Sequence, residues 1–202
     1  MLDHILLDVI GSIREALEAA LLEQQAVEER FQVDVFLGDV SFETSYSLPG
    51  EQNPPRVRAD LSLEWPTWSQ SAYRSWSIGE SPAEPPELAI EVALRLQRLA
   101  SAPDPAIVLA ALAGGTPEIA GEPLERTGTT IEQVHDSDSE TPSAAIEVAY
   151  QGIYRIDEAV LEDPEKIDEQ IAPLASWIAS GLVRLADLKL PTLPAEDSEA
   201  SS

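Results

Sequence analysis

The chain has 202 residues, 44% of them hydrophobic, which is enough apolar material for a packed core. Its 37 acidic residues outnumber its 12 basic ones, and the formal net charge of −25 at pH 7 argues against nucleic acid and anionic membranes as partners. The absence of cysteine excludes disulfides, thiol catalysis and cysteine-based zinc sites.

The ends and the charge of the chain bear on its location and its surroundings. No basic stretch precedes the first apolar residues, and no apolar run is long enough to span a bilayer. We therefore expect a cytoplasmic protein without a signal peptide. Either a high-salt habitat or a basic or unfolded partner would explain the acidity.

The first segment, from Leu2 towards Glu29, has the pattern of an amphipathic helix. Its apolar residues recur on one helical face, as Leu2, Leu6, Val9, Ile13, Leu17 and Leu21. This stripe predicts a helix that faces the core. Part of it also fits a heptad, so the alternative is an oligomer interface through Leu2, Leu6, Val9 and Ile13. We expect a homo-oligomer, formed through this stripe or through a sheet edge.

Between Phe31 and Leu48 the apolar period changes to two, which predicts β-structure. One parity is shared by Phe31, Val33, Val35 and Leu37, and the other by Val40, Phe42, Thr44, Tyr46 and Leu48. A two-residue hairpin turn at Gly38-Asp39 would place Leu37 opposite Val40. A bulge in one long strand would also reset the parity, but local turn chemistry favours the hairpin.

The segment 57–78 contains the clearest strand and most of the aromatic residues. Strict alternation from Val57 to Trp65 predicts a strand that Pro66 ends. Trp68 to Ile78 is predicted to return as a second strand. The candidates for a hydrophobic, protein-binding groove with an acidic rim are Trp65, Trp68, Tyr73 and Trp76. Ordinary packing in the sheet core is the alternative.

The middle of the chain is predicted to contain two helices and an acidic insertion. The helices run from Pro86 to Ala100 and from Ala106 to Ala113, where Gly114-Gly115 ends the second. The stretch 116–143 is polar and rich in Thr, Ser, Pro and Gly, which predicts a flexible acidic insertion or linker. Residues 195–202 are predicted to form a disordered acidic tail.

A strand and a helix are predicted C-terminal to this insertion. Ile146, Val148 and Tyr150 alternate with polar or small residues, as in a half-buried strand, until Gly152 interrupts the pattern. After a polar loop the apolar residues recur at helical spacing, as Ile167, Ile171, Leu174, Ile178, Leu182 and Leu185.

No group of residues in the chain matches a catalytic motif. His4 and His135 are the only histidines. His135 lies in an acidic stretch, which could suggest a metal or an acid–base pair. The stretch is predicted to be mobile, however, and a site of this kind needs rigid support. We therefore expect no catalytic residue, no metal and no cofactor.

Two C-terminal stretches carry a family resemblance. One is the strand sequence from Ile146 to Ile156, and the other is Ile171-Ala172-Pro173-Leu174-Ala175, followed by the Pro- and Leu-rich exit from Leu188 to Pro194. In these stretches the chain resembles the SecB export-chaperone family, and Phe31 to Thr44 is weakly similar to the family's first strand. The resemblance implies an antiparallel sheet with helices on one side and apolar grooves that hold unfolded polypeptide.

The chain also departs from this family. It begins with a long amphipathic helix, it inserts further segments between Ile78 and Ala144, and it ends without a clear second long helix. These departures put the family's tetramer and its translocase contacts in doubt for this chain.

These patterns predict a single α+β domain over residues 1–202, with a meandering antiparallel sheet on which the N-terminal amphipathic helix and the C-terminal helix pack. The expected function is that of a non-enzymatic protein-binding protein, a SecB-like chaperone or adaptor that holds an unfolded or partner polypeptide. The alternative is a structural assembly component, for example of a phage tail or a contractile particle.

Overall fold

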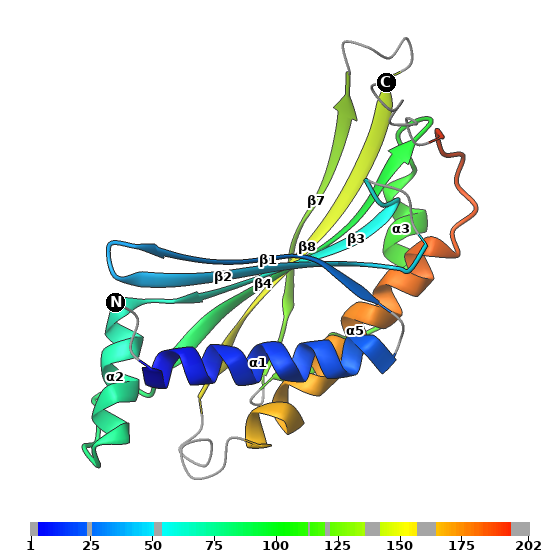
Figure 1. Ribbon diagram of the computed structural model, residues 1–202. Coiled ribbons are helices and arrows are strands. Elements are labelled where there is room, and N and C mark those ends of the chain that lie inside the picture. The colour runs from blue at the N-terminus through cyan, green and yellow to red at the C-terminus, as the bar shows by residue number, and fades with distance from the viewer. Residues whose placement is uncertain are drawn as a thin grey trace, which may run out of the picture.

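The chain folds around a six-stranded antiparallel sheet with the strand order β1-β2-β3-β4-β8-β7 (Figure 1). The computed structural model describes residues 4–23, 26–50, 54–112, 114–119, 122–135, 142–156 and 165–194. In chain order its elements are α1 (His4–Glu23), β1 (Val27–Phe36), β2 (Asp39–Ser47), β3 (Val57–Trp65), α2 (Thr67–Ser77), β4 (Glu87–Leu99), α3 (Pro105–Ala111), β5 (Glu118–Ile119), β6 (Glu122–Pro123), β7 (Glu125–Val134), β8 (Ser143–Arg155) and α5 (Glu165–Ala186).

Helices α1 and α5 cover one face of the sheet and leave the other face open (Figure 1). The alternation along each strand explains this arrangement. In β3 the odd-numbered residues from Val57 to Trp65 are buried, whereas Arg58 and Glu64 point away from the helices. The predicted α+β class, with the N-terminal and C-terminal helices packed on a mostly antiparallel sheet, is confirmed.

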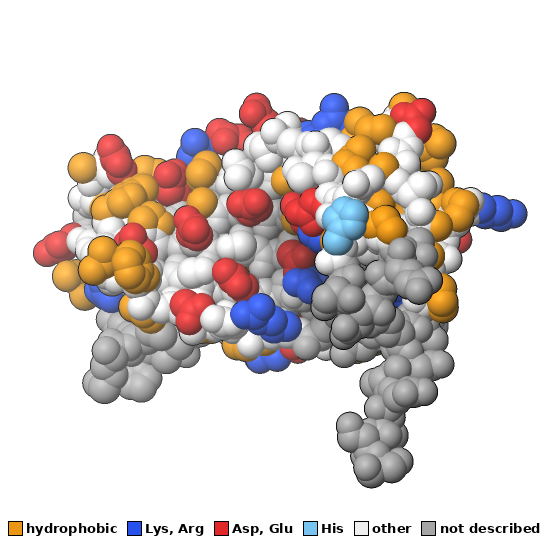
Figure 2. All heavy atoms as spheres, turned by 90° about the horizontal axis from the view of Figure 1, so that it is seen from above, with side chains coloured by type: hydrophobic (Ala, Val, Ile, Leu, Met, Phe, Trp, Pro, Cys, Tyr) orange, Lys and Arg blue, Asp and Glu red, His pale blue; other side chains and the backbone are white. Residues whose placement is uncertain are grey.

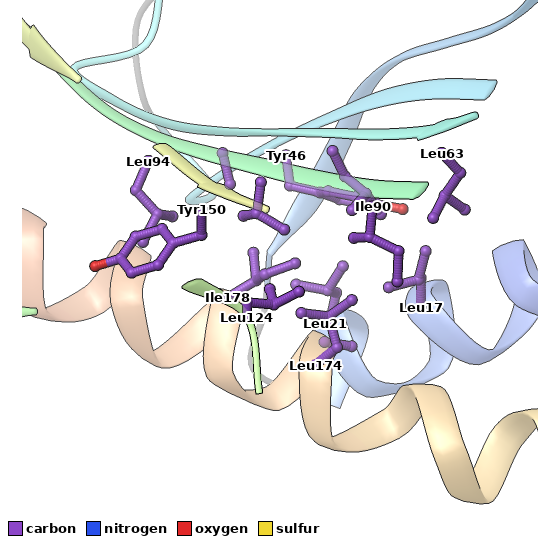
Figure 3. Close-up of a cluster of buried hydrophobic side chains, with 14 of the residues drawn as sticks. Leu17, Leu21, Tyr46, Leu63, Ile90, Leu94, Leu124, Tyr150, Leu174 and Ile178 are labelled. Carbon is purple, nitrogen blue, oxygen red and sulfur yellow. The ribbon is translucent and has the colours of Figure 1, made fainter. Parts of the chain in front are cut away.

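The core lies between the helices and the covered face of the sheet. Figure 3 shows Leu17 and Leu21 of α1 meeting Leu174 and Ile178 of α5 beneath Ile90 of β4. All five side chains are at most 1% exposed. Burying a side chain of this size stabilises the fold by about 1.5–3 kcal/mol, so the contact of the two helices with the sheet accounts for much of the stability.

Strands β1 and β2 form the predicted hairpin. Phe36 faces Asp39 across a two-residue turn, and both turn residues have positive φ, 52° at Leu37 and 96° at Gly38. Two positive φ values are typical of the turn whose twist matches that of the strands. Because the turn is Leu37-Gly38 and not Gly38-Asp39, Val35 faces Val40, and the predicted pairing of Leu37 with Val40 is wrong.

Two predicted elements have the opposite secondary structure. The predicted helix from Pro86 to Ala100 is strand β4, whose even-numbered residues from Leu88 to Leu96 are buried. The predicted strand from Trp68 to Ile78 is helix α2, which buries Ser69, Gln70, Ala72 and Tyr73 at helical spacing. In β4 the alanines on the open face blur the alternation, and in α2 the mixture of Trp, Ser and Tyr resembles a strand in composition.

The region 116–143 also differs from its prediction. The structure places the short pair β5–β6 there, followed by the ten-residue strand β7, which pairs with β8 from Glu125 to Val134. All ten residues of β7 are exposed, so the strand has no apolar period that a sequence could reveal. The acidic residues 136–141 and the tail at 195–202 lie outside the described residues.

Gly152 does not interrupt β8, which continues to Arg155. A Cβ atom at Gly152 would lie 2.4 Å from Cδ2 of Leu124, so glycine here makes room for a packed leucine and does not make a turn.

The remaining predicted elements are confirmed with small shifts. The strand from Val57 to Trp65, the short helix α3 and the C-terminal helix α5 lie where the periodicity placed them. Asp104 caps α3, because its side chain accepts a hydrogen bond from the backbone N–H of Ala106. Helix α1 ends at Glu23, well before Glu29, because β1 begins at Val27. Among the described residues, no helix has the length and apolarity needed to cross a membrane.

Candidate functional site

The four aromatic residues proposed for binding divide into two groups. Trp65 and Tyr73 are 1% and 5% exposed, and their rings meet edge to face with centroids 5.5 Å apart. The indole N–H of Trp65 donates to the hydroxyl of Ser69 at 3.0 Å. These two residues belong to the core, where they fasten α2 to the end of β3. They cannot offer a surface to a partner.

Trp68 and Trp76 lie further out on α2. Trp68 is 45% exposed, and Trp76 is half-buried. Trp68 lines a shallow hollow between α2 and the segment that follows it, together with Ala72 and Pro82. Of the four candidates, Trp68 therefore has the position expected of a contact residue.

Helix α2 is held to the tip of the β1–β2 hairpin by hydrogen bonds. The backbone N–H and the hydroxyl of Thr67 both donate to Oδ1 of Asp39, at 2.6 and 2.8 Å. The bond from the backbone N–H is the main reason why the pKa of Asp39 is lowered. The side-chain amide of Gln70 donates to the carbonyl of Gly38 at 2.9 Å. These bonds hold the first turn of α2, which contains Trp68, against the hairpin tip.

The tip of the β1–β2 hairpin carries side chains that are more exposed than Trp68. Val35, Phe36 and Leu37 are 56%, 76% and 87% exposed. Hydrophobic side chains gather at this end of the molecule, on the left in Figure 2, where the hairpin and α2 lie. We call Val35, Phe36, Leu37 and Trp68 the hairpin-end surface. The turn sequence Phe36-Leu37 was a usable signal, because large apolar residues are unusual at the tip of a hairpin.

The proposed oligomer residues lie on α1. Val9 and Ile13 are 5% and 1% exposed and pack into the chain's own core, so their assignment to an oligomer interface is wrong. Leu2 lies outside the described residues, and the side chain of Leu6 is not described. An oligomer through a sheet edge stays a prediction.

The open face of the sheet is polar and rich in carboxylates. Two of its arginines are each shared between two acidic residues: Arg95 contacts Glu132 at 2.6 Å and Glu147 at 3.3 Å, and Arg155 contacts Glu87 and Glu122. A groove of about 540 Å³ crosses this face from β7 to β3. Its acidic lining residues are Glu64, Glu91, Glu122 and Glu125.

The histidines do not form a site among the described residues. His135 is exposed just after β7, and His4 begins α1. Within the described ranges, no group of three or more His, Asp or Glu residues is arranged to hold a metal ion.

Comparison with known proteins adds no relative to this description. Neither a family model, nor a curated protein, nor a solved structure matches the chain.

Proposed function

We propose that the chain is a non-enzymatic protein-binding protein that holds an unfolded or partner polypeptide at the hairpin-end surface, as a SecB-like chaperone or adaptor. The observation that carries the proposal is the exposure of Phe36 and Leu37 at the hairpin tip, to which the first turn of α2, with the exposed Trp68, is hydrogen-bonded. Burying a large apolar side chain is worth about 1.5–3 kcal/mol, so a partner that covered three of them would gain substantial binding energy.

The high negative charge of the chain favours reversible binding at this surface over aggregation. The chain carries a net charge of −25, and copies of it repel one another in solution. An apolar surface on such a body is available to a partner, while self-association is opposed. The fold, a sheet with helices on one side, also agrees with what the SecB-like resemblance implies.

The test replaces apolar residues of the hairpin-end surface and measures binding of a reduced, carboxymethylated model protein. Phe36→Ser and Trp68→Ala should each weaken binding about tenfold while leaving thermal stability nearly unchanged, because both residues are exposed. The matched control is Ile78→Ser, since Ile78 is 72% exposed and follows the far end of α2. Binding that is unchanged in the first two variants, or equally weak in the control, would refute the proposal.

The alternative is a structural assembly component. The observation that favours it is the pair of free sheet edges, β1 and β7, to which no strand of the described residues adds. A component of this kind would form a complex of fixed mass with its own neighbours and would not suppress aggregation of an unrelated unfolded protein. An aggregation assay combined with native mass spectrometry therefore separates the two functions.

A further inference from the structure

The edge strand β7 is exposed along its whole length. All ten of its residues are exposed, and its inner edge pairs with β8 while its outer edge meets no described strand. A free edge is a row of unpaired N–H and C=O groups that can bind an extended segment regardless of its sequence. From Gly128 to Val134 the pairing with β8 is regular, so this run offers an unbroken edge for pairing.

The surface beside β7 is acidic and therefore favours a positively charged segment. In the pairing register Glu91 of β4 faces Gln151 of β8, which in turn faces Glu125 of β7. Strands lie about 4.8 Å apart, so the two carboxylates share one row of the open face at a separation of about 10 Å. A strand added outside β7 and continued past the register shift between Arg126 and Gly128 would place a side chain about 5 Å beyond Glu125 in the same row.

Among the described residues, three carboxylates on this part of the open face make no ion pair: Glu91 and Glu125 of this row, and Glu64 of the adjacent row. The nearby Arg95 and Arg155 are each shared by two other carboxylates. All three residues line the groove that begins at β7. The groove and the end of β7 thus form a surface with an excess of negative charge.

We propose that β7 binds an extended, basic polypeptide segment by strand addition, with lysine or arginine side chains on the open face directed to Glu125 and into the groove. Charge favours a basic segment over a second copy of the chain as the occupant of β7, because two bodies of charge −25 repel each other. The open face beside β1 differs in having cations among its carboxylates: Arg58 pairs with Asp60, and Arg30 lines the same hollow.

This surface is separate from the hairpin-end surface, and the proposal does not depend on the function assigned there. Phe36→Ser should leave strand addition at β7 unchanged. Loss of binding in that variant would assign the basic segment to the hairpin end and overturn the proposal.

The probe is a ten-residue peptide of alternating lysine and threonine, followed by fluorescence anisotropy. It should bind more tightly at low salt, whereas a glutamate–threonine peptide of the same length should not bind. A lysine–threonine peptide N-methylated at alternate residues loses the hydrogen bonds of one edge and should bind about tenfold more weakly. Equal binding of the methylated peptide would mean attraction by charge alone, and absence of binding by any peptide would equally overturn strand addition.

Two pairs of variants locate the contact. Glu125→Gln should weaken binding severalfold, whereas the same change at Glu43, on the part of the open face near β1, should have no effect. Because the chain has no cysteine, a single introduced one reports position cleanly. Thr130→Cys should form a disulfide with a peptide that carries a central cysteine, and Gln32→Cys on β1 should not.

The same cysteine variants also test whether the peptide binds β1 instead and whether a second copy of the chain occupies β7. Preferential cross-linking at Gln32→Cys would place the peptide on β1. A disulfide between two chains of Thr130→Cys in the absence of peptide would show that a second copy occupies β7. Either result would overturn the proposal.

Discussion

The two faces of the sheet come from the same strands but differ in what they contribute. On the covered face, side chains such as Val92 and Val148 are fully buried in the core. On the open face their neighbours in sequence are Glu91 and Glu147, which remain in contact with solvent. The covered face therefore accounts for the fold. We expect the open face to tolerate change without loss of the fold, because its side chains are in contact with solvent.

Truncation of one core residue should show most clearly that the covered face stabilises the fold more than the open face does. Ile178 of α5 is 0% exposed, so Ile178→Ala should lower the free energy of unfolding by about 2–5 kcal/mol. The comparison is Gln151→Ala on the open face of β8, which should change it by less than about 0.5 kcal/mol. Urea denaturation measures both. Similar losses in the two variants would mean that the open face also contributes to the core.

The same difference explains which elements could be predicted from the sequence. The strand from Val57 to Trp65 and helix α5 have one buried face and one exposed face, so their periodicity is visible. Strand β7 is exposed on both faces and is held by backbone pairing with β8, which leaves no trace in the pattern of side chains. Strand β4 shows alternation, but its open-face alanines also suit a helix.

The candidate site was predicted only in part. Aromatic composition drew attention to the segment 65–76, but it could not separate Trp65 and Tyr73, which face the core, from the exposed Trp68. That separation depends on α2 being a helix. The contribution of Phe36 and Leu37 depends on the hairpin turn, which brings them beside α2 through the bonds to Gly38 and Asp39.

The burial of Tyr46 on the covered face should make the stability of the fold depend on pH. Burial raises the pKa of Tyr46 to about 12 from an ordinary value of 10.0. The unfolded chain therefore loses this proton at lower pH than the folded chain, and stability falls as pH rises from about 10 to 12. The loss should be on the order of 2 kcal/mol.

The control for this effect is Tyr46→Phe, which should lack that part of the alkaline destabilisation. The variant is needed because burial also raises the pKa of Tyr150, which then titrates in the same direction. Identical slopes of stability against pH above 10 in the variant and the parent would contradict the assignment to Tyr46.

Replacing two glycines by alanine should give a smaller difference in stability, because Gly152 is packed against Leu124 and Gly128 is open. Gly152→Ala would place a Cβ 2.4 Å from Leu124, and the required shift should cost about 1–3 kcal/mol. Gly128→Ala on β7 meets nothing within 4 Å and should be neutral or slightly stabilising. Thermal unfolding of the two variants compares them directly. A stable Gly152→Ala would show that Leu124 moves aside at little cost.

The smallest expected effect concerns the charges of the open face. Arg95 holds Glu132 of β7 and Glu147 of β8, and no more than half of any of the three side chains is exposed. Exposed ion pairs contribute little, so Arg95→Gln should cost only about 0.5–1 kcal/mol, and less at high salt. The effect should be local, because this arginine ties the edge strand to the sheet while the core remains packed. Hydrogen exchange should accelerate for amides of β7 and stay unchanged in β3. Acceleration throughout the sheet would mean that the open face supports the whole fold, and the distinction between the two faces would fail.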